Sequence, residues 1–295
     1  GAAPYRRPPN SPLRPADPGA KPLLLVEVGE DSAEGALGPL TVIRSRLNRG
    51  FAGGVNLGLR ALRGQADAFW ILNPDCAVPA RTAQTYAACT MANPGYGLMT
   101  GRTVYYDAPD QVQTAGGFVD RRTGVCRQRD AGGRSDGADA DPAAPLDWVT
   151  GANMVVSPAF LEQAGLMRED YFLYYEEVDW AFRRGDLSIV FAGDAVVYHH
   201  GGTVIGPGSI HRRASPFANY FNHRNRIRFA RRFLRRTPVA AYLYGLAKAG
   251  QLALSGGLQE AYAVIAGMYE LAPPAAIRDR IGGPAAELAF AKVRP

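Results

Sequence analysis

The chain is poor in cysteine, and this scarcity excludes the small disulfide-stapled classes of protein. Its 295 residues include three cysteines, Cys76, Cys89 and Cys126, which lie far apart in the sequence. An odd number at such spacings matches neither a disulfide framework nor a zinc signature. We therefore expect a protein of a reducing compartment, the cytoplasm. A chain of this length can bury one substantial core or two unequal ones.

Long apolar runs are also missing. No stretch approaches the roughly 18 apolar residues that a membrane-spanning helix needs, and the N-terminal residues do not follow the pattern of a signal peptide. No Gly-Lys-Ser/Thr follows the glycine-rich segment, which excludes a P-loop. The sequence contains no internal repeat.

Acidic residues are absent between Ala195 and Gln259. Nine arginines and Lys248 give this block a charge of +10, whereas the whole chain has +6 and the remainder therefore −4. Such a block is typical of contact with a polyanion, either an anionic membrane or a nucleic acid. No nucleic-acid-binding module is recognisable, so we do not expect nucleic acid as a partner.

Aromatic and aliphatic residues lie among these arginines and predict a basic amphipathic helix. Such a helix can rest on an anionic membrane and would place the protein at its inner face. The alternative is a helix packed on the rest of the protein with a solvated basic face. The apolar residues are Phe217, Tyr220, Phe221, Ile227, Phe233 and Leu234.

Alternating strand and helix patterns predict an α/β fold with a mainly parallel sheet flanked by helices. We expect a proline-rich arm over 1–22, a catalytic domain over 23–210 and a basic helical region over 211–295, with an irregular excursion over 107–147. The expected strands are 23–28, 40–43, 68–72, 146–156, 188–191 and 195–198, and the expected helices are 56–62, 82–92, one opening at Pro158 and several after Ser215.

The stretch from Tyr171 to Arg183 is the most informative part of the sequence. Three carboxylates, Glu176, Glu177 and Asp179, directly follow a run of aromatic residues. Partial desolvation against an aromatic wall raises a carboxyl pKa and suits one of them to act as a general base. The alternative is an ordinary helix start, where acidic residues favour the helix dipole. If the stretch is helical, Glu176 and Asp179 share a face and Glu177 points elsewhere.

Two further patterns indicate a ligand site. Asn48–Gly58 holds four glycines before a helical pattern, which lets backbone approach a ligand at a helix start or allows tight packing. Asp75 ends a buried strand, where α/β sheets bind ligands, and could offer an oxygen ligand to a cation. His199 and His200 end another strand, and at most one of them can complete that metal site. Ordinary turn and hydrogen-bonding roles are the alternatives.

Together these motifs resemble the inverting family-2 glycosyltransferases with a Rossmann-like GT-A fold, and most closely their rhamnosyltransferase-like branch. The resemblance runs from about Leu23 to about Phe233. It is carried by Asn48–Gly58, Ile71–Asp75, Trp148–Met154, Tyr171–Asp179, Tyr198–Gly202 and Tyr220–Arg226.

The resemblance implies transfer of a sugar from a dTDP-, UDP- or GDP-linked donor to a hydroxyl of a glycan, lipid-linked or small-molecule acceptor, in cell-envelope synthesis. It implies Glu177 as the base, with Glu176 and Asp179 as alternatives, and Mg²⁺ or Mn²⁺ held by Asp75 and His199. The implied donor-binding residues are Glu27, Asn48, Gly50, Gly54, Asn56 and Asn73, and the implied acceptor-binding residues are Trp148, Gly151 and Trp180; the tryptophans can equally belong to the core.

The chain departs from the family at its start. The family's first strand ends in Thr-Tyr-Asn or similar and its second in Asp-Asn-Gly-Ser, whereas this chain has a proline-rich arm and Glu27-Val-Gly-Glu30. These differences affect the part of the site that holds the nucleotide. A second hypothesis is therefore a non-catalytic binding or scaffold protein with a degenerate donor site.

Overall fold

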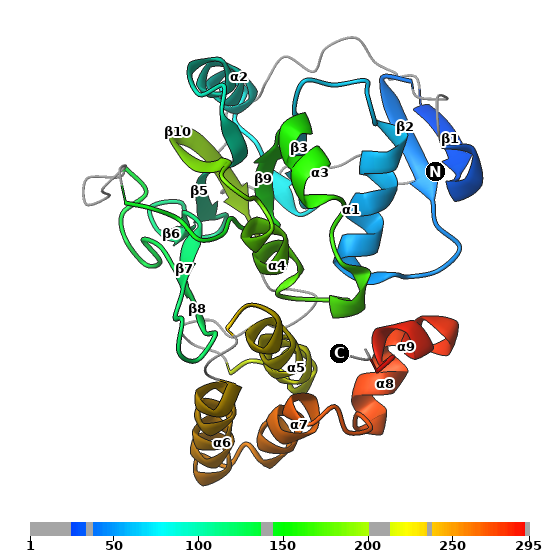
Figure 1. Cartoon of the computed structure of the whole chain (residues 1–295), viewed down its shortest axis with the longest axis vertical. Coiled ribbons are helices and arrows are strands. Elements are labelled where there is room, and N and C mark those ends of the chain that lie inside the picture. The colour runs from blue at the N-terminus through cyan, green and yellow to red at the C-terminus, as the bar shows by residue number, and fades with distance from the viewer. Residues whose placement is uncertain (1–24, 34–37, 137–143, 201–212, 235–237, 293–295) are drawn as a thin grey trace.

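A computed structural model describes residues 25–33, 38–136, 144–200, 213–234 and 238–292 (Figure 1). The predicted proline-rich arm and Gly201-Gly202 lie outside these ranges. The strands are β1 (Leu25–Gly29), β2 (Leu40–Arg44), β3 (Phe69–Leu72), β4 (Cys76–Ala77), β5 (Tyr96–Tyr105), β6 (Val112–Thr114), β7 (Gly117–Val119), β8 (Cys126–Gln128), β9 (Asn153–Val156) and β10 (Ser188–His199). The helices are α1 (Gly50–Ala61), α2 (Thr82–Ala92), α3 (Pro158–Ala164), α4 (Glu176–Phe182), α5 (Pro216–Phe233), α6 (Pro238–Leu254), α7 (Leu258–Met268), α8 (Ala275–Ile281) and α9 (Gly283–Ala289), with 3-10 turns η1 (Glu30–Ser32) and η2 (Glu169–Tyr171).

A six-stranded sheet forms the centre of an α/β fold, as predicted, but its strands are mixed rather than mainly parallel. The order is β3-β9-β5-β10-β4, and β6 also pairs with β5. Within this sheet β5 and β10 are parallel, whereas the pairs β3–β9, β5–β9, β5–β6 and β4–β10 are antiparallel. Parallel neighbours need a long crossover, usually helical. The connection from β5 to β9 runs instead through the short strands β6, β7 and β8.

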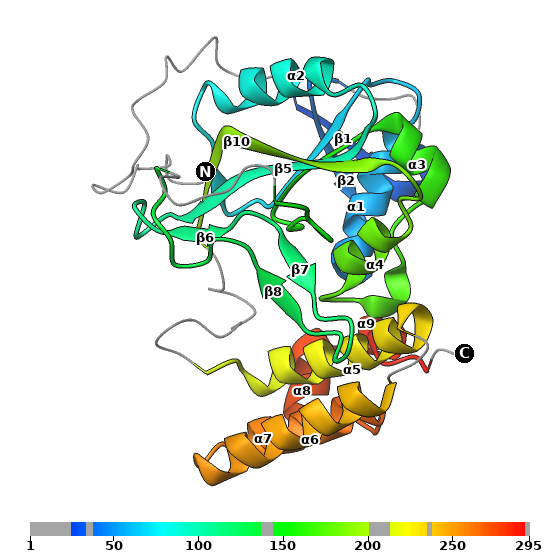
Figure 2. The same cartoon turned by 60° about the vertical axis from the view of Figure 1, so that its left-hand side comes forward.

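Helices cover both faces of this sheet (Figures 1 and 2). Met99 and Val155 pack towards Tyr86 of α2, while their neighbours Leu98 and Met154 belong to the larger cluster that includes α1, α3 and α4. Adjacent residues of a strand point to opposite faces, which explains this division. The excursion predicted as irregular holds the short strands β6, β7 and β8.

β1 and β2 pair in parallel as a separate two-stranded sheet. No residue of either strand is buried. Leu25 and Leu40 leave 51% and 43% of their surface exposed. The pair therefore contributes little to the core.

The C-terminal helices gather at one end of the protein, where Figure 1 shows α6 and α7 below α5 and α8 and α9 to its right. α5 begins where the Ser215 hydroxyl accepts a hydrogen bond from the Ala218 amide and Pro216 occupies the first turn, a strong helix start. Of its 18 residues, 13 are buried, Arg224, Arg226 and Arg228 among them. The prediction of a basic membrane-surface helix is therefore wrong for α5, because these arginines face the interior.

Among the described residues, none of the helices combines the length and the apolar character that crossing a bilayer would require. The predicted boundaries between the catalytic domain and the helical region stay predictions.

α1 begins at Gly50, six residues before the predicted start at Asn56. Gly50 has φ +74°, and a Cβ there would lie 2.0 Å from the carbonyl oxygen of Phe172. The Phe51 amide donates to that oxygen at 3.0 Å. The glycines thus form the first turns of a helix that closely approaches the loop before α4.

Asn56 fastens α1 to the segment before this loop. Its side chain is 1% exposed, accepts from the Met167 amide at 3.0 Å and donates to the Met167 carbonyl and to Glu169, each at 2.9 Å. These bonds join elements more than a hundred residues apart.

We expect Asn56→Ala to lower the free energy of unfolding by roughly 2–4 kcal/mol, because it leaves buried backbone groups of Met167 without partners. Urea titration followed by circular dichroism measures this. The control is Asn93→Ala, which removes hydrogen bonds to the nearby Cys89 and should cost about 1 kcal/mol or less. Equal decreases in the free energy of unfolding of both variants would contradict the role of Asn56 in holding α1 to the segment around Met167.

Candidate functional site

The loop before α4 has an unusual backbone. Phe172, Tyr174 and Tyr175 have φ values of +62°, +68° and +72°. Bulky residues seldom adopt this left-handed conformation, which costs of order 1–3 kcal/mol for each residue and concentrates at functional sites. The surrounding structure must therefore hold this loop in place.

α5 supplies that support. The Asn225 amide donates to the carbonyls of Tyr171, Leu173 and Tyr174 at 2.9, 2.6 and 2.9 Å. Nη2 of Arg224 also donates to the Tyr171 carbonyl, at 2.7 Å. Both side chains are buried. Arg224 and Asn225, which lie in the motif Tyr220–Arg226 of the sequence analysis, thus position the loop that precedes the three carboxylates.

Asp179 is fully engaged in this scaffold. Its buried carboxylate pairs with Arg183 at 2.8 Å and with Arg232 at 2.5 Å, and accepts from the Tyr171 hydroxyl at 2.9 Å. Both oxygens already have partners. The structure therefore gives Asp179 a structural role rather than that of a base.

Glu176 lies on the same face of α4, as the helical spacing predicted. It is 2% exposed, and its Oε2 has no hydrogen-bond partner among the described residues. Burial, together with the neighbouring Glu177, holds the pKa of Glu176 well above the ordinary 4.5. The buried group is thus neutral well above the pH at which an exposed glutamate ionises.

Glu177 points into a cavity of about 390 Å³. Its Oε2 is buried, and no partner for it occurs in the described ranges. Burial raises the pKa of Glu177 to about 7, against hydrogen bonds from the first amides of α4 that lower it. A carboxyl that titrates near neutrality can accept a proton from a bound hydroxyl.

The cavity has an aromatic wall and a polar wall. Trp148, Tyr174 and Tyr175 line the first. The polar wall comes from α5 and α6, and its members were not among the predicted site residues: Asn219, Asn222, His223, Arg226 and Lys248. The feature of the sequence that could have revealed this wall is the basic block, which we had assigned to the protein surface.

A second cluster brings together Asp75, Cys76 and His199. Their potential ligand atoms all lie within 4.8 Å of one another. The antiparallel pairing of β4 with β10 places His199 opposite Cys76. The prediction that Asp75 and His199 come together is thus confirmed, and His200 turns aside to stack on Tyr106 at 3.9 Å.

The protonation of His199 suits a cation. Its Nδ1 lies 2.7 Å from Oε1 of Gln113 and donates to it, since an amide oxygen only accepts. Burial lowers the pKa of His199, so the ring is neutral at pH 7 and Nε2 carries a lone pair. This lone pair faces Oδ1 of Asp75 at 3.2 Å. A cation between the two would convert an unfavourable contact into two ligand bonds.

Cys76 fits a different role. Burial and the neighbouring Asp75 raise the pKa of its thiol to about 12, and the thiol lies 3.5 Å from the Ala152 carbonyl, to which it donates. The donor set without a thiolate is one carboxylate and one imidazole. Such ligands suit Mg²⁺ or Mn²⁺ when a bound ligand or water supplies further oxygens.

One short segment connects the two clusters. Trp148 lines the cavity, and four residues later the Ala152 carbonyl accepts from the Asn73 amide at 3.1 Å. Asn73 also places its Nδ2 3.4 Å from Nε2 of His199. Asn73 therefore lies at the candidate cation site, between it and the segment that borders the cavity.

The other predicted donor-binding residues have partners within the protein or lie away from the cation site and the cavity. The Asn56 amide is saturated as described above, Glu27 forms an exposed bidentate pair with Arg44, and Asn48 accepts from the Gly50 amide at 2.9 Å. Gly50 packs against Phe172, and Gly54 faces open space. The structure therefore gives four of these five residues a structural role: Glu27, Asn48, Gly50 and Asn56.

The predicted acceptor-binding residues also divide. Trp148 lines the cavity, but Trp180 has no exposed surface and donates to the Gly165 carbonyl at 2.7 Å. Gly151 packs against the ring of Phe51. The structure thus assigns Trp180 to the core and Gly151 to helix packing.

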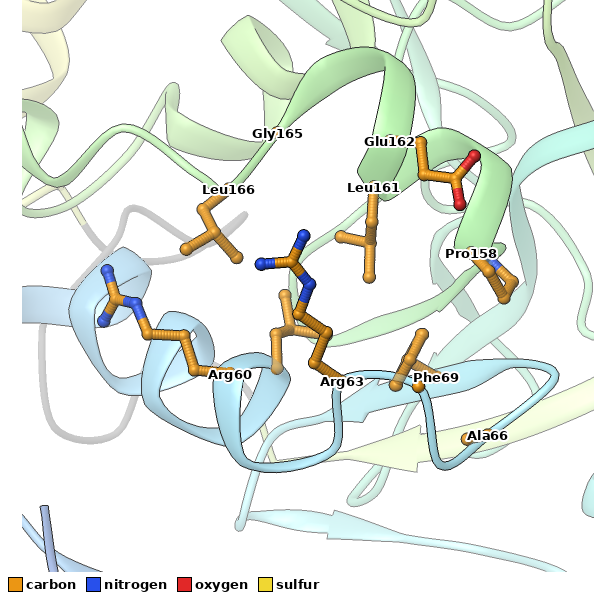
Figure 3. Close-up of a pocket in the computed structure, with 11 residues that line it drawn as sticks. Arg60, Arg63, Ala66, Phe69, Pro158, Leu161, Glu162, Gly165 and Leu166 are labelled. Carbon is orange, nitrogen blue, oxygen red and sulfur yellow. The ribbon is translucent and has the colours of Figure 1, made fainter. Parts of the chain in front are cut away.

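Figure 3 shows another cavity, of about 340 Å³, between α1, β3 and α3. Arg60, Arg63 and Glu162 surround its apolar lining. It contains none of the residues predicted to act in catalysis, metal binding or substrate binding.

Comparison of the sequence with protein-family models and with curated proteins finds no match. Among solved structures, the fold is similar to a crystal structure of GalNAc-T7 with UDP, GalNAc and Mn²⁺, at a TM-score of 0.48 and 11% sequence identity over 76% of this chain. The match covers 43% of that protein's chain, less than two thirds of its length. A likeness of this degree assigns neither residues nor activity.

We expect Glu176→Gln to be more stable than the wild type at pH 8 by roughly 1–3 kcal/mol, and about equally stable at pH 4. Because the pKa is raised in the folded state, the stability from the protonated carboxyl is present below pH 4.5 and is lost as pH rises towards the folded pKa. Denaturant unfolding at both values measures this, with exposed Glu162→Gln as control. If Glu176→Gln has the wild-type free energy of unfolding at both pH values, Glu176 does not have a raised pKa.

We expect Mn²⁺ to bind, His199→Ala to abolish binding, and Gln113→Ala to weaken it about tenfold, since the partner that orients a histidine ligand typically matters this much. Titration followed by electron paramagnetic resonance measures the affinity. The control is His200→Phe, which keeps a stacked ring beside Tyr106. Unchanged Mn²⁺ affinity in His199→Ala would exclude the site.

Proposed function

We propose that this protein is a divalent-cation-dependent, inverting glycosyltransferase that moves a sugar from a nucleotide-sugar donor to an acceptor hydroxyl. One observation carries the proposal. The carboxyl of Glu177, whose pKa is raised to about 7, faces a cavity. The segment from Trp148 to Ala152 borders this cavity at one end and at the other end contacts Asn73, beside the Asp75–His199 pair.

The proposed reaction is a single displacement. The acceptor oxygen forms a bond to the anomeric carbon of the donor sugar while the bond from that carbon to the diphosphate oxygen breaks. Glu177 takes the proton of the acceptor hydroxyl, and the nucleoside diphosphate leaves. Glu177 is the one carboxylate among the described residues that line the cavity, so the proposal assigns the base to it.

Asp75 and His199 would hold Mg²⁺ or Mn²⁺. When bound, the cation would neutralise charge that develops on the departing diphosphate. Asn73 would contact the donor next to it, and Trp148 would offer a face to the acceptor sugar. A cytoplasmic location and a glycan, lipid-linked or small-molecule acceptor of the cell envelope belong to the same proposal.

The second candidate is a non-catalytic binding or scaffold protein. The internal hydrogen bonds of Asn56 and the ion pair of Glu27 with Arg44 favour it, because both residues belonged to the predicted donor site. This candidate keeps the cavity and gives up sugar transfer. Nucleotide binding separates the two.

The decisive experiment is a donor-hydrolysis screen with Mn²⁺ against dTDP-, UDP- and GDP-sugars. We expect release of one nucleoside diphosphate, loss of this activity in Asp75→Ala, and a loss of about 10²–10⁴-fold in Glu177→Gln. The wild-type rate should rise with pH through about 7, because Glu177 must lose its proton to act as base.

His200→Phe serves as control and should keep the wild-type rate. Calorimetry with the three nucleoside diphosphates and Mn²⁺ completes the test. No turnover together with no nucleotide binding would overturn the proposal in favour of the scaffold.

A further inference from the structure

Arg226 is a buried charge without a counter-charge. The side chain is 2% exposed, and no carboxylate in the described part of the chain lies within ion-pair distance of it. Its Nε and Nη1 have no hydrogen-bond partner there. Its neighbours on α5 differ, since Arg228 pairs with Glu270 and Arg232 with Asp179.

The contacts that Arg226 does make leave its charge uncompensated. Its guanidinium lies 4.5 Å from the centre of the Tyr244 ring, and Nη2 donates to Nδ1 of His223 at 3.1 Å. Both partners are neutral. A buried charge held only by neutral groups is strongly unfavourable, so an anion that entered the cavity would supply the missing partner.

The groups around Arg226 also suit an anion. Burial, with Arg226 and Lys248 nearby, lowers the pKa of His223 to about 3. Because its Nδ1 accepts from Arg226, the proton of the neutral ring lies on Nε2, which makes His223 a donor rather than a base. Lys248 lines the cavity from α6, and its Nζ donates to the neutral Gln251 amide at 3.0 Å.

Unsatisfied polar atoms concentrate at this cavity. Of the buried side-chain atoms without a hydrogen-bond partner in the described residues, those of Tyr174, Glu177 and Arg226 all belong to its lining. Buried polar atoms are nearly always paired, so this cluster of exceptions calls for a partner that enters the cavity, such as a water, an ion or a polar ligand.

We propose that the polar wall of the cavity is a subsite for an anionic group of the acceptor, a phosphate or a carboxylate. Arg226 and Lys248 would hold this group. A guanidinium binds either group through two parallel hydrogen bonds. Glu177 would then face a hydroxyl of the same molecule. The identification of this molecule as the acceptor rests on the proposed function, whereas the binding of the anion does not.

The anion can belong to a free sugar phosphate or to a lipid headgroup. α6, which supplies Lys248, leaves Leu243, Leu246 and Tyr244 exposed by 61%, 43% and 40%. An apolar surface beside an anion-binding wall suits a lipid as well as a soluble acid. The experiment therefore has an arm for each source.

In the soluble arm, calorimetry measures binding of glucose 1-phosphate, glucuronate and neutral methyl glucoside, without nucleotide or Mn²⁺. We expect the acids to bind more tightly than the neutral sugar, Arg226→Met to weaken acid binding at least tenfold, and Lys248→Gln to weaken it several-fold. Arg278→Gln, at an exposed arginine of α8, is the matched control and should bind as the wild type does.

In the lipid arm, co-sedimentation measures binding to phosphatidylcholine vesicles with and without phosphatidylinositol. Selective binding to the anionic vesicles that Arg226→Met and Lys248→Gln lose, without binding of soluble acids, would identify a lipid headgroup. Binding that is equal for acids and the neutral sugar, or undiminished in both variants, would overturn the proposal. So would a lack of anion binding in both arms.

Thermal unfolding separates a ligand-binding role from a structural one. Removing an unpaired buried charge should keep or raise the melting temperature, so Arg226→Met should melt no lower than the wild type. If Arg226→Met does not fold, Arg226 holds the structure together, and the loss of anion binding in Lys248→Gln decides the proposal. Anion binding without donor turnover would defeat the transferase alone, and turnover onto neutral acceptors without anion binding would defeat this inference alone.

Discussion

The carboxamide of Asn225 meets three backbone carbonyls of the loop 171–175, and the candidate active site depends on this contact. Left-handed conformations at three aromatic residues are unfavourable by themselves. With these carbonyls held, the chain enters α4 so that Asp179 faces the arginines beneath it and Glu177 faces the cavity. A single amide on a neighbouring helix thus determines which carboxylate is available for chemistry.

α5 carries three buried arginines, Arg224, Arg226 and Arg228, and a partly buried one, Arg232, whose partners differ. Arg224 donates to backbone carbonyls, Arg228 pairs with Glu270, and Arg232 pairs with Asp179. The contacts of Arg224 and Arg232 join α5 to the loop before α4 and to α4 itself, whereas the pair of Arg228 with Glu270 joins α5 to the segment after α7. Arg226 departs from this pattern, since no acid of the described residues pairs with it at its position beside the cavity.

The sequence predicted the features that a local pattern or the family resemblance indicates. Helical spacing separated Glu177 from Asp179, and the rule that strand ends carry ligands, together with the resemblance, brought Asp75 and His199 together. The antiparallel course of β9 did not follow, because nothing local to it sets its direction. The hydrogen bonds of Asn56 reach a segment more than a hundred residues away, and burial of the α5 arginines requires helices that come after them.

The support of the loop by α5 also fixes when the site can form during synthesis. A ribosome makes Glu177 roughly fifty residues before Asn225, and domains generally fold as they emerge. Until α5 has emerged and docked, the carbonyls of the loop lack their donors and the strained turn has nothing to hold it. A nascent chain that already contains Asp75, His199 and Glu177 therefore still lacks the support of this loop, and the candidate site forms in one late step.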